Sequence, residues 1–475
     1  MTDLAFRSAT DLLQGLARGE FSSVELLRHQ LARVDAINPR LNAVVTLDAE
    51  RALARAAEAD AARAGGRSWG ALHGLPMTIK DSFETAGLRT TSGAPPLAQH
   101  VPERNAAAVQ RLLDAGAIVF GKTNLPTFAM DVQSFNPVFG TTNNPWDTTR
   151  SPGGSSGGAA AALAAGLTPL ELGSDIGGSI RNPAHYCGVY GHKPSFGIVP
   201  LTGHIPGPPG TLSETDIAVA GPMARSADDL ALALDVLAGA SARDAVAWKL
   251  TLPPPRRTSL REFRVAAWLD DEASPVDAAV KGRLEALVEA LRSAGVGVDT
   301  RARPKHGLAD ALAVYYPLLF AATSPGLPRE QFDALVAKAG SDDFARASTM
   351  RHRDWLVLNE QREKQRLNWA RFFADHDVLL CPVTPTAAIV HDHGDPGARR
   401  ITVNGEARDY WDQVDWAGLC GAAMLPATVA PAGRTAGGLP VGVQIVGPYL
   451  EDRTTIEFAR LIAPRVGGFD APPGL

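Results

Sequence analysis

The sequence is poor in cysteine, with only Cys187, Cys381 and Cys420 in 475 residues. Three scattered cysteines are too few for a disulfide framework or for a zinc site. All three stand among apolar residues, and free buried thiols are typical of a reducing compartment. We therefore expect a cytoplasmic protein that binds no metal.

Long hydrophobic runs and a strong excess of one charge are also lacking. The longest apolar run, residues 159–172, contains glycine and proline and is too short to cross a bilayer. The first residues, MTDLAFRSATDLLQGL, have the pattern of an amphipathic helix rather than of a signal peptide. The formal net charge is −5, so the composition gives no reason to expect a nucleic acid or an anionic membrane as partner.

Strand patterns alternate with helix patterns along most of the chain. Short apolar segments bounded by turn residues, such as Leu72–Ile79, Phe263–Leu269 and Val441–Val446, predict buried strands. Segments with apolar residues at helical spacing separate them. This alternation predicts an α/β fold in which helices pack around a sheet.

We find no internal repeat, low-complexity tract or linker, and we therefore expect a single domain over residues 1–475. Helix patterns predict an N-terminal helical layer over about residues 1–65, with a capping box at Ser22–Glu25. A nearly continuous helical pattern predicts a helical elaboration of the domain over about residues 305–375. Residues 385–408 show neither pattern, and we expect them to be irregular.

Two glycine-wrapped serine turns lie close together, GGSSGG at residues 153–158 and DIGGS at residues 175–179. Glycine beside a serine lets the backbone adopt positive φ and lets a ligand approach the chain closely. Each turn also leads into a helix, whose first N–H groups have no partner within that helix. Such N–H groups can hold an oxygen that becomes negative during acyl transfer. One serine could therefore attack a substrate while the other relays a proton.

These segments resemble the signature of the amidase signature family, serine hydrolases that use a Ser–Ser–Lys triad. The matching pieces include GGSSGG, GSDIGGSIRNPA, CGVYGHKPS, GLPMTIKDSFETAGLRTTSGA and LPVGVQIVGPYLEDRTTIEFARLI. The resemblance spans nearly the whole chain and is weakest over residues 250–375. It implies the amidase signature fold, a mixed central β-sheet covered on both sides by α-helices.

Lys80 stands at the end of a predicted buried strand, where it must pair with a carboxylate or lose its charge. Pairing with the neighbouring Asp81 at the surface is one alternative. The resemblance implies the other, in which a neutral Lys80 takes a proton from the nucleophile Ser179 through Ser155. It also implies a cis peptide bond between Gly154 and Ser155.

Further site residues follow from the same two turns. We expect Asp175 and Arg181 to form an ion pair that fixes the second turn, and Met130 and Gly154 to contact the substrate. An oxyanion hole is expected from the N–H groups of Ile176, Gly177, Gly178 and Ser179. We expect the pocket walls to come from Pro200–Thr215 and residues 305–408, with the aromatic candidates Tyr315, Tyr316, Trp355, Tyr410 and Trp411.

Three rival patterns are rejected. Gly116–Thr123 matches a phosphate loop, but its apolar middle and its helix–glycine–strand order do not suit one. Gly154–Gly158 fits G-x-S-x-G, which would make Ser156 the nucleophile, but a loop rather than a strand precedes it. We expect Ser156 to cap a helix. His391–His393 is expected to be a solvated loop rather than a metal site.

The resemblance implies hydrolysis of a carbon–nitrogen acyl bond in an amide, anilide or carbamate (urethane), through an acyl-enzyme. Water is then the second substrate and no cofactor is needed. Ester hydrolysis stays open, and so does a homodimer. One alternative is the glutaminase subunit of a tRNA-dependent amidotransferase, although Leu201–Gly221 lacks that subunit's usual Ser-Ser-Leu-Asp-Gln-type segment. The other is a non-catalytic binding protein on this fold, although all three triad positions are filled.

Overall fold

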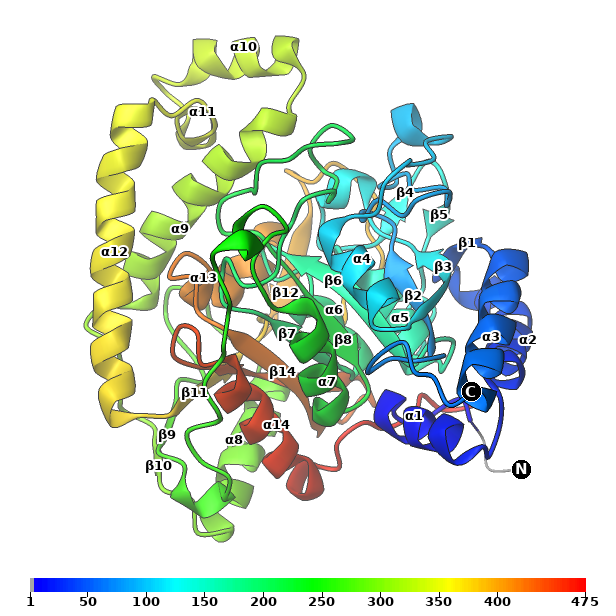
Figure 1. Ribbon diagram of the computed structural model, residues 1–475. Helices are drawn as coiled ribbons and strands as arrows, with labels where there is room; N and C mark the ends of the chain where they lie inside the picture. The colour runs from blue at the N-terminus through cyan, green and yellow to red at the C-terminus, as the bar shows by residue number, and fades with distance from the viewer. Residues whose placement is uncertain (1–3) are drawn as a thin grey trace.

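The computed structural model describes residues 4–475 and is built around a large mixed β-sheet (Figure 1). The strand order is β10-β9-β11-β15-β14-β7-β8-β6. β9 pairs in parallel with β10 and β11, whereas the pairings from β11 to β6 are antiparallel. The strands are β6 (Leu170–Asp175), β7 (Tyr190–Lys193), β8 (Val219–Ala224), β9 (Val265–Ala267), β10 (Val298–Asp299), β11 (Val378–Pro382), β14 (Ala427–Arg434) and β15 (Pro440–Val446). The predicted mixed central sheet is confirmed.

Helices cover both faces of this sheet. On β8, Met223 packs into one apolar cluster with Ala160 and Ala184, whereas the next residue, Ala224, belongs to the main core with Leu230 and Leu284. Successive side chains of a strand point to opposite faces, so the two clusters lie on opposite sides of the sheet. The first cluster uses α5 (Gly157–Ala164) and α6 (Arg181–Cys187), and the main core uses α7 (Ala227–Leu237), α8 (Ala278–Ser293) and α14 (Asp452–Val466).

A smaller sheet of order β1-β3-β2 lies beside the N-terminal helices. Its strands are β1 (Val44–Leu47), β2 (Pro76–Lys80) and β3 (Ile118–Thr123), and the helices are α1 (Ala9–Arg18), α2 (Ser23–Leu41), α3 (Ala49–Ala64) and α4 (Ala107–Asp114). The expected helical layer is thus interrupted by β1, where Val44, Val45 and Thr46 favour extended backbone. Residues 1–3 of that layer lie outside the described residues. β2 packs alongside β6, which brings the edges of the two sheets together.

The segment between β10 and β11 forms a group of helices on one side of the large sheet (Figure 1). They are α9 (Leu308–Thr323), α10 (Arg329–Lys338), α11 (Asp343–Ser348) and α12 (His352–Asp375), and the shorter α13 (Asp415–Gly421) packs against α9. None of the described helices combines the length and the apolar character needed to cross a membrane. Buried residues from both sheets belong to one main apolar core. We therefore propose that the chain forms a single domain.

Residues 385–408 are not wholly irregular, contrary to the expectation. They include β12 (Arg400–Val403) and the start of β13 (Glu406–Asp409), which pair as an antiparallel hairpin. Asn404 and Gly405 connect the strands with φ of 52° and 85°. Asn-Gly favours the two-residue turns whose central residues both need positive φ. This pair is the signal in the sequence that the prediction missed. A second short hairpin joins β4 (Phe135–Asn136) to β5 (Gly140–Thr141).

Candidate active site

The two serine turns meet in the folded chain. The Ser156 N–H donates to the carbonyl oxygen of Ser179 over 3.0 Å. Ser155 and Ser179 both line a cavity of about 760 Å³, and Ser179 is slightly more exposed than Ser155. The peptide bond between Gly154 and Ser155 is cis. Two serines, 24 residues apart in sequence, therefore face one cavity.

Lys80 is the last residue of β2 and is fully buried. Its Nζ donates to Oγ of Ser155 over 2.7 Å and to Oγ of Ser174 over 2.9 Å. Asp81 is also buried, and its Oδ2 accepts from the N–H and the hydroxyl of Thr91. The alternative of a Lys80–Asp81 surface pair is therefore wrong.

Burial also sets the charge of Lys80. It lowers the pKa of the amine to about 7, although the negative charges of Asp175 and Glu171 act in the opposite direction. A large fraction of the amine is then uncharged near neutral pH and can accept a proton. Lys80 thus has both the geometry and the protonation state that a base acting through Ser155 needs.

Ser174 is a site residue that the sequence reasoning missed. It lies on β6, lines the cavity and accepts the second hydrogen bond of Lys80. Only the contact between β2 and β6 brings it to Lys80. The sequence holds no signal for this contact beyond the position of Ser174 at the start of the second turn.

An ion pair between Asp175 and Arg181 holds the turn that presents Ser179. Both side chains are fully buried, and Nη2 of Arg181 lies 2.7 Å from Oδ1 of Asp175. The Asp175 carboxylate also accepts from the N–H groups of Gly178 and Ile180, over 2.9 and 3.0 Å. Burial alone would raise the pKa of Asp175, but the charge and hydrogen bonds of Arg181 bring it to about 2. The predicted ion pair is present, and it ties down the turn.

The same carboxylate changes the expected oxyanion hole. The Gly178 N–H points to Asp175, so it is already satisfied in this structure. Gly178 has a φ of 95°, a conformation that favours glycine and that turns this N–H inward. The N–H groups of Gly177 and Ser179 donate no hydrogen bond within the described part of the chain. Together with Ile176, which lines the cavity, these two N–H groups stay candidates for the oxyanion hole.

Met130 lines the cavity and is 54% exposed. Gly154 is not among the lining residues, contrary to the expectation. A Cβ added to Gly154 would lie 2.6 Å from the backbone nitrogen of Gln133 and 2.7 Å from the carbonyl oxygen of Asp131. Gly154 is therefore required for close packing of two backbone segments.

The expected pocket walls are partly present. Eight residues of the segment 204–215 line the cavity, as does Trp355 on α12. The hydroxyl of Tyr315 instead donates to the carbonyl oxygen of Ile176 over 3.0 Å, behind the turn. Tyr410 is buried and donates to Asp131. These two tyrosines support the site from behind rather than forming its wall, and Tyr316 and Trp411 are also absent from the lining.

The rejected patterns have structural roles. Ser156 occupies the N-cap position of α5, but its hydroxyl makes no capping bond and instead lies 3.4 Å from the carbonyl oxygen of Ser174. Lys122 lies within β3, and its Nζ donates to the carbonyl oxygen of Phe83, so no phosphate loop forms there. His393 stacks on Phe135 at a ring distance of 4.0 Å.

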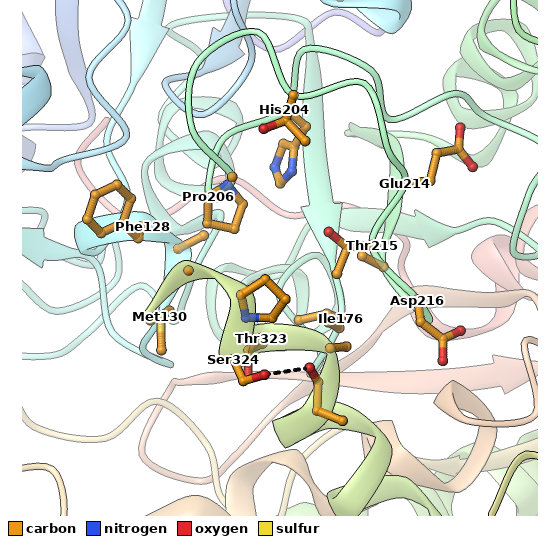
Figure 2. Close-up of a pocket in the computed structure, with 18 of the residues that line it drawn as sticks. Phe128, Met130, Ile176, His204, Pro206, Glu214, Thr215, Asp216, Thr323 and Ser324 are labelled. Carbon is orange, nitrogen blue, oxygen red and sulfur yellow. Dashed lines mark hydrogen bonds between the residues drawn. The ribbon is translucent and has the colours of Figure 1, made fainter. Parts of the chain in front are cut away.

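The cavity has an apolar side and an acidic side (Figure 2). Figure 2 shows Phe128, Met130 and Pro206 on one side and Glu214 and Asp216 on the other. Further apolar lining comes from Ala321, Ala322, Pro325, Met350 and Trp355. Among the described residues that line the cavity there is no lysine or arginine.

Asp175→Asn is expected to lower the free energy of unfolding by about 3–5 kcal/mol, because it leaves the buried Arg181 without its counter-charge. Denaturant unfolding at pH 7 measures this loss. The double variant Asp175→Asn/Arg181→Met, which removes both charges, should recover part of it. A loss below about 1 kcal/mol in the single variant would contradict the role given to this pair.

Comparison with known proteins identifies the family of this chain. The family model described as Amidase matches residues 25–456. The glutamyl-tRNA(Gln) amidotransferase A subunit of Deinococcus deserti is 36% identical over 95% of this chain and 95% of its own length. The corresponding protein of a Picosynechococcus species is 32% identical, with 95% and 96% covered.

A solved structure shares the whole architecture. It is an inhibitor-bound chain from a vestigial complex described as revealing the evolutionary origins of an s-triazine catabolic enzyme. It superposes with a TM-score of 0.83 at 26% identity and covers 98% of this chain and 100% of its own. The match of the family model, the relatives and the fold together show that this chain belongs to the amidase signature family, whose members hydrolyse carbon–nitrogen bonds.

Proposed function

We propose that the protein hydrolyses the carbon–nitrogen acyl bond of a small amide, anilide or carbamate that carries an apolar acyl or aryl group. Ser179 is the nucleophile, Ser155 relays its proton and Lys80 is the base. The observation that carries this proposal is the fully buried Lys80 with its 2.7 Å hydrogen bond to Ser155. A neutral amine next to Ser155 has a lone pair that can accept a proton, and a serine hydroxyl must lose its proton to a base in order to attack.

The reaction follows from these positions. Ser179 loses its proton to Ser155 as Ser155 gives its own proton to Lys80, so the amine becomes an ammonium ion. The N–H groups of the second turn stabilise the oxygen that becomes negative. When the tetrahedral intermediate collapses, the proton returns along the same route to the leaving amine. Water then attacks the acyl-enzyme by the same path and releases the acid. A carbamate cleaved at its carbon–nitrogen bond releases instead a carbonic acid half-ester, which loses CO₂ to leave the alcohol.

The proposed base predicts how activity depends on pH. Because burial lowers the pKa of Lys80 to about 7, kcat/KM should fall as the pH is lowered through that value. The ammonium form that then accumulates cannot accept the proton of Ser155. Hydrolysis of a p-nitroanilide between pH 5 and pH 9 measures this, and a rate independent of pH between 6 and 8 would contradict it.

The cavity lining favours an apolar substrate. Phe128, Met130, Pro206 and Trp355 offer apolar surface, and such surface favours hydrophobic groups over zwitterions. Burial lowers the pKa of His204 to about 3, with nearby Lys80 acting in the same direction, so this histidine is uncharged. The α-carboxylate of glutamine would therefore find no lysine, arginine or charged His204 in the lining, where the other histidine, His352, stacks on Trp355.

The names of the relatives support a second function, the glutaminase subunit of a glutamyl-tRNA(Gln) amidotransferase. In that case the chain would work with partner subunits and tRNA. Assays of the purified chain on glutamine and on a series of aryl amides, carbamates and esters separate the two functions. Release of aryl amine without glutamine hydrolysis supports the first proposal, and hydrolysis of glutamine alone supports the second.

A further inference from the structure

Two polar side-chain contacts join the edge of the small sheet to the edge of the large one. Nζ of Lys80 donates to Oγ of Ser174 over 2.9 Å, and Oγ1 of Thr78 donates to Oε1 of Glu171 over 2.5 Å. Thr78 and Lys80 are two residues apart on β2, and Glu171 and Ser174 lie on β6. We call these four residues the sheet seam. The triad amine therefore shares the sheet seam with a carboxyl group that the mechanism above does not use.

The environment of Glu171 is unsuited to a negative charge. The residue is 1% exposed, and its Oε2 is buried with no hydrogen-bond partner within residues 4–475. A buried carboxylate oxygen that lacks a partner is costly, whereas the protonated acid avoids most of that cost. Burial accordingly raises the pKa of Glu171 to about 8, although hydrogen bonding from Thr78, Thr123 and the Leu172 N–H and the charge of Lys122 oppose the rise.

Few other charges face this carboxyl group. Lys80 on β2 and Lys122 on β3 are the nearby cations, and Asp175 is at the end of β6 itself. Asp81 lies beyond them and interacts with Lys122. The other two elements that pack most closely against β6 are α5 and β8, and neither carries a titratable side chain. The charge of Glu171 therefore acts mainly on the two lysines, of which only Lys80 bonds to Ser155.

We propose that Glu171 is a positioning residue for the proton of the triad: it shares one proton with Lys80 near neutral pH, and holding that proton on its carboxyl group leaves the amine uncharged. A single proton shared by Glu171 and Lys80 can be bound either to the carboxyl group or to the amine. On the carboxyl group it leaves an amine that can accept from Ser155; on the amine it leaves a carboxylate and an ammonium ion, which is inactive. The burial of the Glu171 carboxyl group favours the first arrangement, and the hydrogen bond from Thr78 favours the second, so both are populated. This inference rests on the proposed function of Lys80.

Glu171→Gln tests the inference, because glutamine keeps the acceptor for Thr78 and cannot ionise. The inactive carboxylate–ammonium arrangement then disappears, so Lys80 becomes neutral at lower pH. The rate at which a fluorophosphonate labels Ser179 should rise with pH in both proteins, with the midpoint about half a unit to one unit lower in Glu171→Gln. A purely structural role of Glu171 would change the amplitude or the stability but not the midpoint.

Thr78→Val is the matched second variant and decides the matter if Glu171→Gln does not fold. It removes the hydrogen bond that favours the ionised carboxyl group, so its midpoint should move in the same direction by a smaller amount. If the midpoints of both variants stayed within about 0.2 pH units of the wild-type value, the inference would be overturned. The pH dependence of the wild type would in that case still support the proposed function. A wild-type protein that is not labelled at Ser179 would overturn the proposed function itself.

Discussion

Ser179→Ala is expected to abolish labelling by a fluorophosphonate and to reduce hydrolysis of any accepted amide by about 10⁴-fold or more. Ser179 lines the cavity and follows the turn that Asp175 and Arg181 hold. Removal of its hydroxyl leaves the pocket and the turn in place, so KM should change little while kcat collapses. Steady-state kinetics and mass spectrometry of the labelled chain measure both effects.

Ser156→Ala is the matched control for this prediction. Ser156 is adjacent to Ser155 and fully buried, and among the described residues its hydroxyl hydrogen-bonds only to the backbone carbonyl of Ser174, at 3.4 Å. The control should keep labelling and retain activity to within about tenfold. Equal labelling of wild type and Ser179→Ala, or loss of labelling in Ser156→Ala alone, would contradict the assignment of the nucleophile.

Lys80→Met is the second substitution with a large expected effect, a loss of about 10²–10⁴-fold in kcat/KM. Methionine is apolar and of similar length, and replacing a buried amine by an apolar side chain need not destabilise the chain. Ser155 and Ser174 line the cavity, so water can replace the lost amine as their partner. The loss should therefore appear in kcat with little change in thermal stability. It should also remove the acid limb of the pH profile, because no other base is hydrogen-bonded to Ser155 among the described residues.

Lys122→Met provides the comparison, since Lys122 is equally buried on the neighbouring strand β3. Its Nζ donates to the carbonyl oxygen of Phe83 and to Thr85, and it does not line the cavity. We expect this variant to lose stability, because those two acceptors lose their partner, but to keep the acid limb. If both variants lost the acid limb, or if Lys80→Met kept it, Lys80 would not be the base.

Much of the site could be predicted because its residues are close together in sequence. The two serine turns lie within 27 residues, and the glycines around them mark where the backbone turns. The lysine could be predicted because a charge at the end of a buried strand requires an explanation. The resemblance supplied what local patterns could not, namely the relay order and the cis bond at Ser155.

The features that were missed depend on contacts between distant segments. Ser174 and Glu171 meet β2 only because two sheet edges pack together, and no periodicity in either strand indicates that contact. The inward N–H of Gly178 depends on where the Asp175 carboxylate lies after folding. The tyrosines at 315 and 410 carry apolar patterns that fit a pocket wall and a buried support equally well.

The central claim is that an uncharged amine at residue 80 draws the proton of Ser179 through Ser155. The most direct measurement is the pH dependence of fluorophosphonate labelling of Ser179 in wild type and in Lys80→Met. The account predicts a wild-type labelling rate that rises with pH about a midpoint near 7, the pKa to which burial lowers Lys80, and a slow rate without that midpoint in the variant. A midpoint near 7 in both proteins would contradict it.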